Sequence, residues 1–364
     1  KVYIKHSIQM ICFFAMLYSL ILLIFRKSLI GFFQLGEEGI INGAITYLVI
    51  VSYGLIFYFI NPVFASIFNG YGDSKTPFMI NAVGLIINMV LDPLLIFGVG
   101  FLPRLEVAGA AVATVIAQGI VTLIFIIKAR RRELFSDLNL GTRPNIKYVN
   151  AIIKLGLPVA LQSGLFAIFA MIIARIIAQW GPIPVAVQKV GSQIEAISWM
   201  TAGGFQTAMG AFVGQNYGAE KWERVYKGYF VGMAIVSVIG ILATGVLIFG
   251  ARPIFSIFIP HEESIKQGIT YLKILGLSQF FMCIEITTSG AFNGLGKTLP
   301  PSIVGILFNG LRIPGALILS STSLGLNGVW WAISISSMFK GVILTTLYIS
   351  FLNQNQNTKH LRVF

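Results

Sequence analysis

Two parts of this sequence repeat one another, and both are strongly apolar. Phe68-Asn-Gly-Tyr-Gly72 returns as Phe292-Asn-Gly-Leu-Gly296, and Lys, Thr and Pro follow in each copy. An apolar stretch with an Asn-x4-Pro motif comes next in both copies, starting at Asn88 and at Asn309. Paired halves with a spacing of about 220 residues are typical of membrane transporters that are built from two similar helix bundles.

The register of the repeat also makes a prediction about what precedes residue 1. Lys1-Val2-Tyr3 aligns with Arg224-Val225-Tyr226, whereas residues 150–223 have no counterpart in the first copy. The sequence starts on Lys rather than Met, which agrees with this alignment. We therefore expect that about two helices and an N-terminal tail precede this sequence in the natural protein.

The composition requires a membrane environment. Hydrophobic residues make up 56% and charged residues 11% of the 364 residues, and the mean hydropathy is +0.84. So few charges cannot cover a soluble globule of this size. Cys12 and Cys283 lie within apolar segments, and His6, His261 and His360 lie near segment ends. We therefore expect no disulfide framework, no metal cluster of His or Cys, and no cofactor.

Ten segments are long and apolar enough to cross a bilayer, which takes about 20 apolar residues per helix. They lie near residues 7–25, 44–69, 78–98, 107–127, 153–179, 184–211, 225–250, 270–291, 301–321 and 326–352. Several contain Gly or Pro, which is tolerated where neighbouring helices or a wet cavity satisfy the freed backbone groups. The sequence thus predicts an all-α, polytopic membrane protein with about ten transmembrane helices of an expected twelve.

A polar loop separates the first four predicted spans from the last six. With two preceding helices added, this division predicts two six-helix lobes that are parallel repeats, related by an axis along the membrane normal. The substrate path is then expected between the lobes. The predicted parts are an N-lobe at 1–127, a cytoplasmic linker at 128–152, a C-lobe at 153–352 and a cytoplasmic tail at 353–364.

The net charge of +13 is interpreted as a topology signal. The basic residues are concentrated in the loops that a cytoplasmic residue 1 places on the cytoplasmic side. They are dispersed over short loops without a nucleic-acid-binding module, so no nucleic-acid partner is expected. We interpret the cluster Lys128-Ala-Arg-Arg-Arg132 as an anchor of this orientation, with contact to anionic lipid headgroups as the alternative.

Five motifs occur in a fixed order on the predicted spans and loops. They are Asn69-Gly-Tyr-Gly-Asp-Ser-Lys-Thr-Pro77, Asn88-Met-Val-Leu-Asp92-Pro93-Leu-Leu-Ile-Phe-Gly98, Val107-Ala-Gly-Ala-Ala-Val-Ala-Thr114, Val213-Gly-Gln-Asn-Tyr-Gly-Ala219 and Gly290-Ala-Phe-Asn-Gly-Leu-Gly-Lys-Thr298. Together they resemble the MATE (multidrug and toxic compound extrusion) transporters, from the family's third helix to its twelfth. The resemblance implies two six-helix lobes and export of organic, often cationic, small molecules coupled to Na⁺ or H⁺. With it we expect a monomer in a bacterial cytoplasmic (inner) membrane.

Asp92 is the one acidic residue well inside a predicted N-lobe span. Burying a carboxylate there costs roughly 2.5–3.5 kcal/mol, which makes it a functional candidate. Asn88 lies four residues earlier on the same helical face, and hard oxygen ligands suit a proton or a Na⁺ ion. The resemblance adds Thr114 and an acid on the family's first helix, and Phe166 replaces a C-lobe acid of some branches. The alternative is that Asn88 only satisfies backbone groups near Pro93 and that Asp92 pairs with a neighbour.

The predicted C-lobe also buries charged residues. Glu285 takes the place of Asn61 in the repeat, and Arg312 and Lys340 lie in the last two spans. An ion pair of Glu285 with Arg312 or with Lys340 would hold the lobe together, or the same residues would take part in substrate or proton binding. The sequence leaves both interpretations open.

Three further polar residues, Glu195, Gln162 and Gln193, are candidates for a substrate path, with interhelical hydrogen bonding as the alternative. A rival function is a flippase of lipids or lipid-linked oligosaccharides from the same broad superfamily. Such a flippase would show a more cationic cavity, whereas the buried charges here nearly balance. A membrane enzyme would need a nucleophile and base, or a metal triad, within the spans. Neither His nor Cys is placed for one, so we expect no enzyme.

Overall fold

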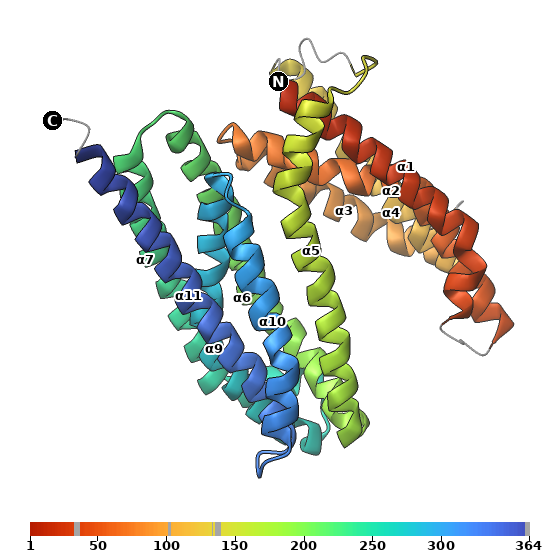
Figure 1. The fold of residues 1–364 in the computed structure, drawn as a ribbon. Helices are drawn as coiled ribbons and strands as arrows, with labels where there is room; N and C mark the ends of the chain where they lie inside the picture. Colours follow the sequence, from red (N-terminus) through yellow and green to blue (C-terminus); the bar gives the residue numbers. More distant parts are fainter. Residues whose placement is uncertain (33–36, 101–102, 133, 135–139, 361–364) are drawn as a thin grey trace. The chain divides into compact units, whose positions relative to one another are not determined.

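The computed structural model describes residues 1–32, 37–100, 103–132, 134 and 140–360. In this part of the chain every regular element is a helix, which confirms the predicted all-α class (Figure 1). The long helices are α1 (Val2–Gly31), α2 (Glu38–Gly70), α3 (Lys75–Phe97), α4 (Glu106–Arg131), α5 (Ile146–Ile177), α6 (Pro182–Gly218), α7 (Trp222–Phe249), α9 (Glu262–Gly294), α10 (Leu299–Ser320) and α11 (Leu326–His360). The 3-10 helix η1 (Ala178–Trp180) and helix α8 (Ala251–Phe258) are short.

The chain forms two compact units, Lys1–Ile153 and Lys154–Phe364, and α5 begins in the first and continues in the second. In the first unit, α4 packs against α2 and α3, and α1 packs against α2. The rings of Phe64 and Phe68 on α2 lie 5.9 and 5.8 Å from the ring of Phe125 on α4. This buried aromatic cluster holds the two helices together at the end where α2 meets the loop to α3.

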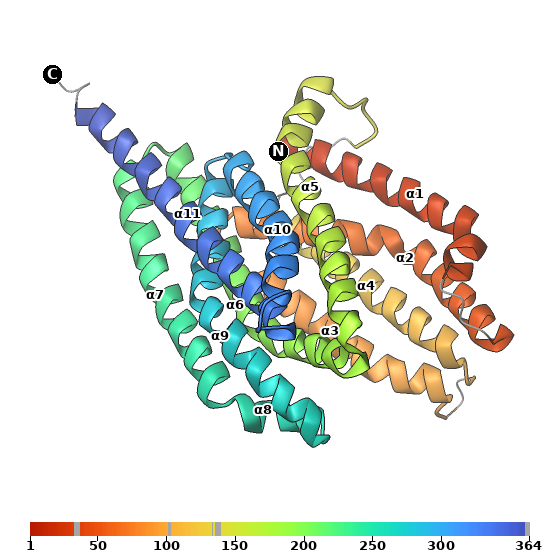
Figure 2. The ribbon, with the colours of Figure 1, turned by 60° about the horizontal axis from the view of Figure 1, so that its bottom comes forward.

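Helix α9 is the central helix of the second unit, where it packs against α6, α7 and α11 (Figures 1 and 2). A Cβ atom at Gly290 of α9 would collide with the backbone of Gln206 on α6, so a glycine is required for this close approach. Helix α10 packs on α11. The C-terminal end of α5 joins the same core through three buried isoleucines, Ile173, Ile176 and Ile177.

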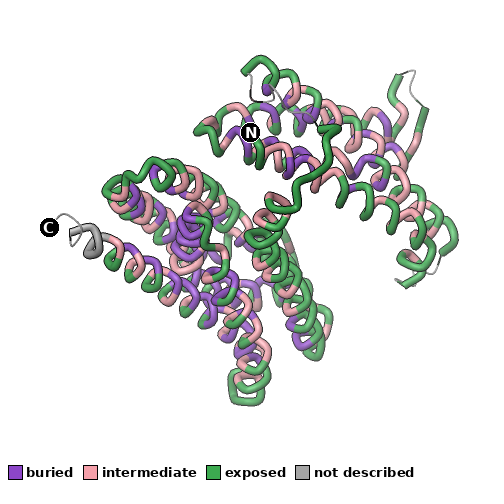
Figure 3. Tube along the Cα trace, turned by 45° about the horizontal axis from the view of Figure 1, so that its top comes forward, coloured by how far each residue is buried: buried purple, intermediate pink, exposed green. Residues whose placement is uncertain are grey.

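Nine of the ten long helices that the structure describes are long and apolar enough to cross a membrane. The tenth, α6, covers the span predicted at 184–211 but is less apolar than the other nine. Its first half contains the polar residues Gln188, Lys189, Ser192, Gln193 and Glu195. All ten predicted segments fall on long helices, and most helices extend beyond them into polar ends. Buried, intermediate and exposed positions are interspersed along most of these helices, whereas α5 is buried only near its C-terminal end (Figure 3).

The sequence repeat is also visible in the backbone. After α2 and after α9 the chain turns through Gly72 and Gly296, whose φ angles are +84° and +70°. The N–H of Gly72 donates to the carbonyl of Asn69 and that of Gly296 to the carbonyl of Asn293, both at 2.9 Å. Residues with a Cβ atom rarely adopt this left-handed backbone conformation, so the turn itself requires the repeated glycine.

The segment predicted as a linker at 128–152 is helical at both ends, because α4 ends at Arg131 and α5 begins at Ile146. Residues 133 and 135–139 of this segment lie outside the described part of the chain. Helix α11 continues to His360, through much of the segment predicted as a tail at 353–364.

Side chains of α1 bind the last described part of this linker. The Gln9 amide Nε2 donates to the carbonyl oxygens of Leu140 and Thr142, both at 2.8 Å. The buried His6 ring bonds to the carbonyl of Val2 through Nδ1 at 2.8 Å, and its Nε2 accepts the backbone N–H of Asn145 at 3.0 Å. The linker is therefore fixed to the first unit just before α5 begins.

Candidate functional site

The structure brings together the three residues that the sequence singles out in the N-lobe. The Asn88 amide Nδ2 on α3 donates to Asp92 Oδ1 at 3.3 Å and lies 3.4 Å from Thr114 Oγ1 on α4. Both distances exceed the usual range for N–H···O bonds, so the contacts are loose. The Thr114 hydroxyl also donates to the carbonyl of Ala110 at 2.8 Å. Asn88 thus bonds to Asp92 on its own helix and contacts Thr114 across the helix pair, an arrangement that agrees with both interpretations of these residues.

The neighbouring amide network of the first unit was not predicted. Asn61 on α2 donates through Nδ2 to the side-chain oxygen of Gln118 at 2.8 Å, and its own oxygen accepts the Thr122 hydroxyl at 2.7 Å. Both partners lie on α4. Asn61 occupies the repeat position of Glu285, so the equivalent contact between helices is neutral in one unit and charged in the other.

All six C-lobe residues that the sequence proposes line one cavity of about 830 Å³ in the second unit. Its wall is formed by α5, α6, α9, α10 and α11. The predicted residues in the wall are Gln162, Gln193, Glu195, Glu285, Arg312 and Lys340. They come from all five helices, and no spacing within one helix could place them together.

Glu195 on α6 is buried and bonded to neutral donors of α9. The Tyr271 hydroxyl donates to Oε1 at 2.5 Å, and the Gln279 amide donates to Oε2 at 2.9 Å. The Ser198 hydroxyl completes the network by donating to the side-chain oxygen of Gln279. Sequence reasoning identified Glu195 but neither partner, because Tyr271 and Gln279 look like ordinary span residues until α6 and α9 are packed together.

The structure pairs Glu285 with Lys340 and not with Arg312. Lys340 Nζ on α11 lies 3.5 Å from Glu285 Oε2 on α9, and the two side chains are 9% and 8% exposed. Arg312 on α10 instead donates through Nε to the Ser336 hydroxyl at 2.7 Å and through Nη2 to the Ser337 hydroxyl at 2.9 Å. Of the four charged groups that line the cavity, Glu285 and Lys340 pair with each other, whereas Glu195 and Arg312 bond to neutral side chains.

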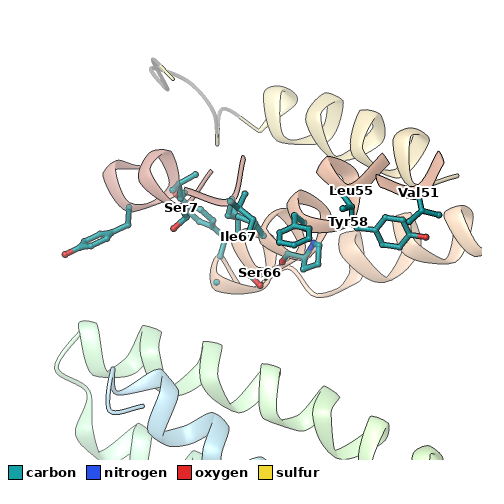
Figure 4. Close-up of a pocket in the computed structure, with 14 residues that line it drawn as sticks. Ser7, Val51, Leu55, Tyr58, Ser66 and Ile67 are labelled. Carbon is teal, nitrogen blue, oxygen red and sulfur yellow. Dashed lines mark hydrogen bonds between the residues drawn. The ribbon is translucent and has the colours of Figure 1, made fainter. Parts of the chain in front are cut away.

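A second pocket, of about 1120 Å³, lies in the first unit along α1 and α2 (Figure 4). Its lining is mostly apolar, with Val51, Leu55 and Ile67 beside the hydroxyl groups of Tyr58 and Ser66. It contains none of the residues that the sequence proposes. Tyr58 and Phe59 of the aromatic run at 57–59 belong to the lining, but such runs are more often lipid-facing anchors and do not predict a pocket. The cavity of the second unit is lined by more charged and hydrogen-bonding side chains than this pocket.

The fold and the buried charged cavity define a multi-pass helical membrane protein of two units with related motifs. The MatE family model matches residues 1–94 and 158–318, and the chain belongs to this MATE family. The family consists of transporters rather than enzymes.

Curated relatives agree with this membership. The "Probable multidrug resistance protein NorM" of Thermotoga maritima is 30% identical over 88% of this chain and 70% of its own length. The "Probable multidrug resistance protein YoeA" of Bacillus subtilis is 26% identical over 80% of this chain and 65% of its own length. A "FAD transporter" of Shewanella oneidensis is 26% identical over 74% of this chain. The chain spans 60% of the length of that last relative.

Solved structures share the fold. A MATE crystal structure in the bent conformation superposes with a TM-score of 0.87 at 22% identity, over 98% of this chain and 84% of that one. An outward-facing MATE family transporter of the MOP superfamily gives a TM-score of 0.85 at 23% identity, over 98% of this chain and 79% of that one. A further MATE structure, in complex with MaD3S, has a TM-score of 0.82.

Proposed function

We propose that the protein is a secondary active antiporter that exports organic, cationic or amphipathic compounds in exchange for Na⁺ or H⁺. The proposed lobes are residues 1–127 and 153–352, joined by a cytoplasmic linker at 128–152 and followed by a cytoplasmic tail. They open a central path alternately to the two sides of a bacterial cytoplasmic membrane, and the protein works as a monomer. Family membership and the multidrug resistance names of its relatives support this proposal.

The observation that carries the proposal is the cavity of about 830 Å³ in the second unit. Small-molecule sites commonly measure roughly 300–1,000 Å³, so this cavity has room for a drug-sized compound. Its lining includes the carboxylates of Glu195 and Glu285 and the rings of Phe166, Phe169 and Trp199. A flat cationic compound can be bound by such a combination of carboxylates and ring faces.

The coupling ion is assigned to Asn88, Asp92 and Thr114. Their oxygen atoms are hard ligands, and Asp92 can also carry a proton. In the observed arrangement the Asn88 nitrogen faces both Asp92 and Thr114. A Na⁺ ion therefore needs the Asn88 amide turned so that its oxygen faces the site, whereas a proton on Asp92 needs no such rotation.

The direct test is transport by the purified protein in proteoliposomes. Ethidium movement should accelerate when a Na⁺ gradient or a pH gradient is imposed, each applied separately. The control is Glu106→Gln, at the exposed start of α4, which should transport like the unchanged protein. Ethidium movement that neither gradient accelerates, together with gradient-independent flipping of fluorescent lipids, would favour the flippase function instead.

Alternating access has a separate test. Ser74 and Lys297 occupy equivalent loops of the two repeats, after α2 and after α9. Spin labels at these positions should give a distance distribution that shifts with pH, Na⁺ or ethidium. A single distribution that responds to none of the three would contradict lobe motion.

A further inference from the structure

The cavity of the second unit contains one cation that no carboxylate neutralises directly. In the described part of the chain, Lys340 is within salt-bridge distance of Glu285, whereas Arg312 donates its hydrogen bonds to two serine hydroxyls. Both carboxylates act on Arg312 through space, but neither binds its guanidinium. The two acidic and two basic residues of the cavity balance in number. In the contacts of the described residues, however, Arg312 has no carboxylate partner and remains available to a ligand.

The guanidinium has unused bonding capacity. An arginine carries five N–H donors in a planar fork, and the bonds to Ser336 and Ser337 use one donor on Nε and one on Nη2. The remaining donors belong to a side chain that lines the cavity. Donors removed from bulk water are costly unless they meet acceptors, and a planar fork matches the two oxygens of a carboxylate or phosphate.

A second group on the same helix also lacks a partner. Asn309, one turn before Arg312 on α10, is 3% exposed and lines the same cavity. Its amide oxygen has no hydrogen-bond partner among the described residues. A ligand that places an N–H or O–H group near Asn309 would satisfy this acceptor.

We propose that Arg312 is an anion-binding residue of the cavity, so that among cationic or amphipathic compounds the cavity prefers those that also carry a carboxylate or phosphate group. The oxyanion bonds to the free N–H groups of Arg312, and a neighbouring donor group of the compound bonds to Asn309. Glu195 on α6, which accepts hydrogen bonds from Tyr271 and Gln279 on α9, attracts a positive group of the same compound. This inference rests on the proposed export function, because it specifies the compounds that the cavity accepts.

Two dyes of nearly equal shape test the inference by binding alone. Rhodamine 110 has a free carboxylate, and rhodamine 123 is its methyl ester. Fluorescence anisotropy with the full chain in detergent should show rhodamine 110 binding roughly tenfold more tightly, the minimum expected for a charge-assisted hydrogen bond. Arg312→Gln should reduce this preference to about one, and Arg312→Lys should retain part of it because it keeps the charge but not the fork.

The control variant removes a charge elsewhere in the same unit. Arg175 is an exposed residue near the C-terminal end of α5, outside the cavity lining, and Arg175→Gln should keep the preference of the unchanged protein. A purely structural role for Arg312 predicts lower stability but an unchanged ratio between the two dyes. An equal affinity of the unchanged protein for both dyes, or an Arg312→Gln variant that keeps the preference, would overturn the proposal.

A measurement without variants covers the case in which Arg312→Gln does not fold. Benzoate should displace rhodamine 110 from the unchanged protein, and benzamide, its neutral analogue, should not. Equal displacement by both, or displacement by inorganic phosphate as strong as by benzoate, would overturn the assignment to organic anions. Binding is measured apart from transport, so selective binding without gradient-driven transport would contradict the export function and leave the role of Arg312 standing.

Discussion

Glu285 on α9 and Lys340 on α11 form an ion pair of 3.5 Å whose side chains are less than one-tenth exposed. Removing one partner leaves the other charge buried without a counter-ion. We predict that Glu285→Gln lowers the free energy of unfolding by roughly 3–5 kcal/mol, as measured by thermal unfolding in detergent.

The double variant Glu285→Gln with Lys340→Met is the control for this prediction. It removes both charges and should recover most of the lost stability, because no unpaired charge remains. Transport by the double variant separates the two interpretations of the pair. Full transport would identify the pair as structural, and loss of transport with recovered stability would place it in substrate or proton binding.

The coupling assignment predicts that Asp92→Asn abolishes gradient-driven transport while the protein still accumulates in the membrane. The amide keeps the shape of the side chain but cannot carry a proton or a negative charge. Thr114→Val should also impair transport, whereas Thr114→Ser, which keeps the hydroxyl, should not. The measurement is efflux in proteoliposomes under Na⁺ and pH gradients. Transport by Asp92→Asn at the rate of the unchanged protein would refute the assignment.

Asp73, in the loop between α2 and α3, provides a pH-dependent contact. Its carboxylate accepts the hydroxyl and the backbone N–H of Thr76 and pairs with Arg132. Hydrogen bonding by Thr76, with the nearby Arg132 charge, holds the pKa of Asp73 below its usual value. Because the folded pKa is the lower one, the contribution to stability is complete above the unfolded pKa of about 4 and is lost as the pH falls through the folded value.

Asp73→Asn should therefore lower the melting temperature slightly at neutral pH, by roughly one or two degrees, since an ion pair whose Arg132 side chain is 51% exposed contributes little. The difference between the variant and the unchanged protein should begin to shrink below about pH 4 and should be lost below the folded pKa of Asp73, where the carboxyl group is protonated in both states. Melting curves over this pH range check the prediction. A difference that stays constant across the range would show that the charge of Asp73 is not involved.

The contacts of His6 and Gln9 with the linker predict its local stability. The N–H of Asn145 donates to His6 and should exchange slowly with solvent deuterium. His6→Ala together with Gln9→Ala should speed exchange in the linker peptide several-fold, as measured by mass spectrometry. Ser7→Ala, on the face of α1 that lines the apolar pocket, is the matched control and should leave exchange unchanged. Equal exchange in all three proteins would mean that these side chains do not hold the linker.

Periodic features of the sequence predicted much of the fold. Ten apolar segments correspond to ten long helices, and the repeated glycines at positions 72 and 296 correspond to equivalent turns. Buried charge was also informative, because burying a carboxylate in a span is costly and has to be compensated. For this reason the sequence alone identifies Glu195 and Glu285 as candidates.

Partners across helices could not be predicted in the same way. Nothing in the spacing distinguishes Arg312 from Lys340 as the counter-ion of Glu285, because the choice depends on how α10 and α11 are rotated against α9. The same holds for Tyr271 and Gln279 around Glu195. The apolar pocket of the first unit has no sequence signature, since its lining residues serve equally well against lipid.

The helices that form the wall of the charged cavity are not packed equally closely on all sides. Gly290 lets α9 lie directly on the backbone of α6, while α5 is buried mainly at its C-terminal isoleucines and otherwise touches α10 through contacts such as Gln162 against Gly305. An inhibitor that wedges α6 from α9 would have to separate two backbones. One that inserts beside α5 has to displace a few side chains, so α5 and α10 form the better target for a blocking compound.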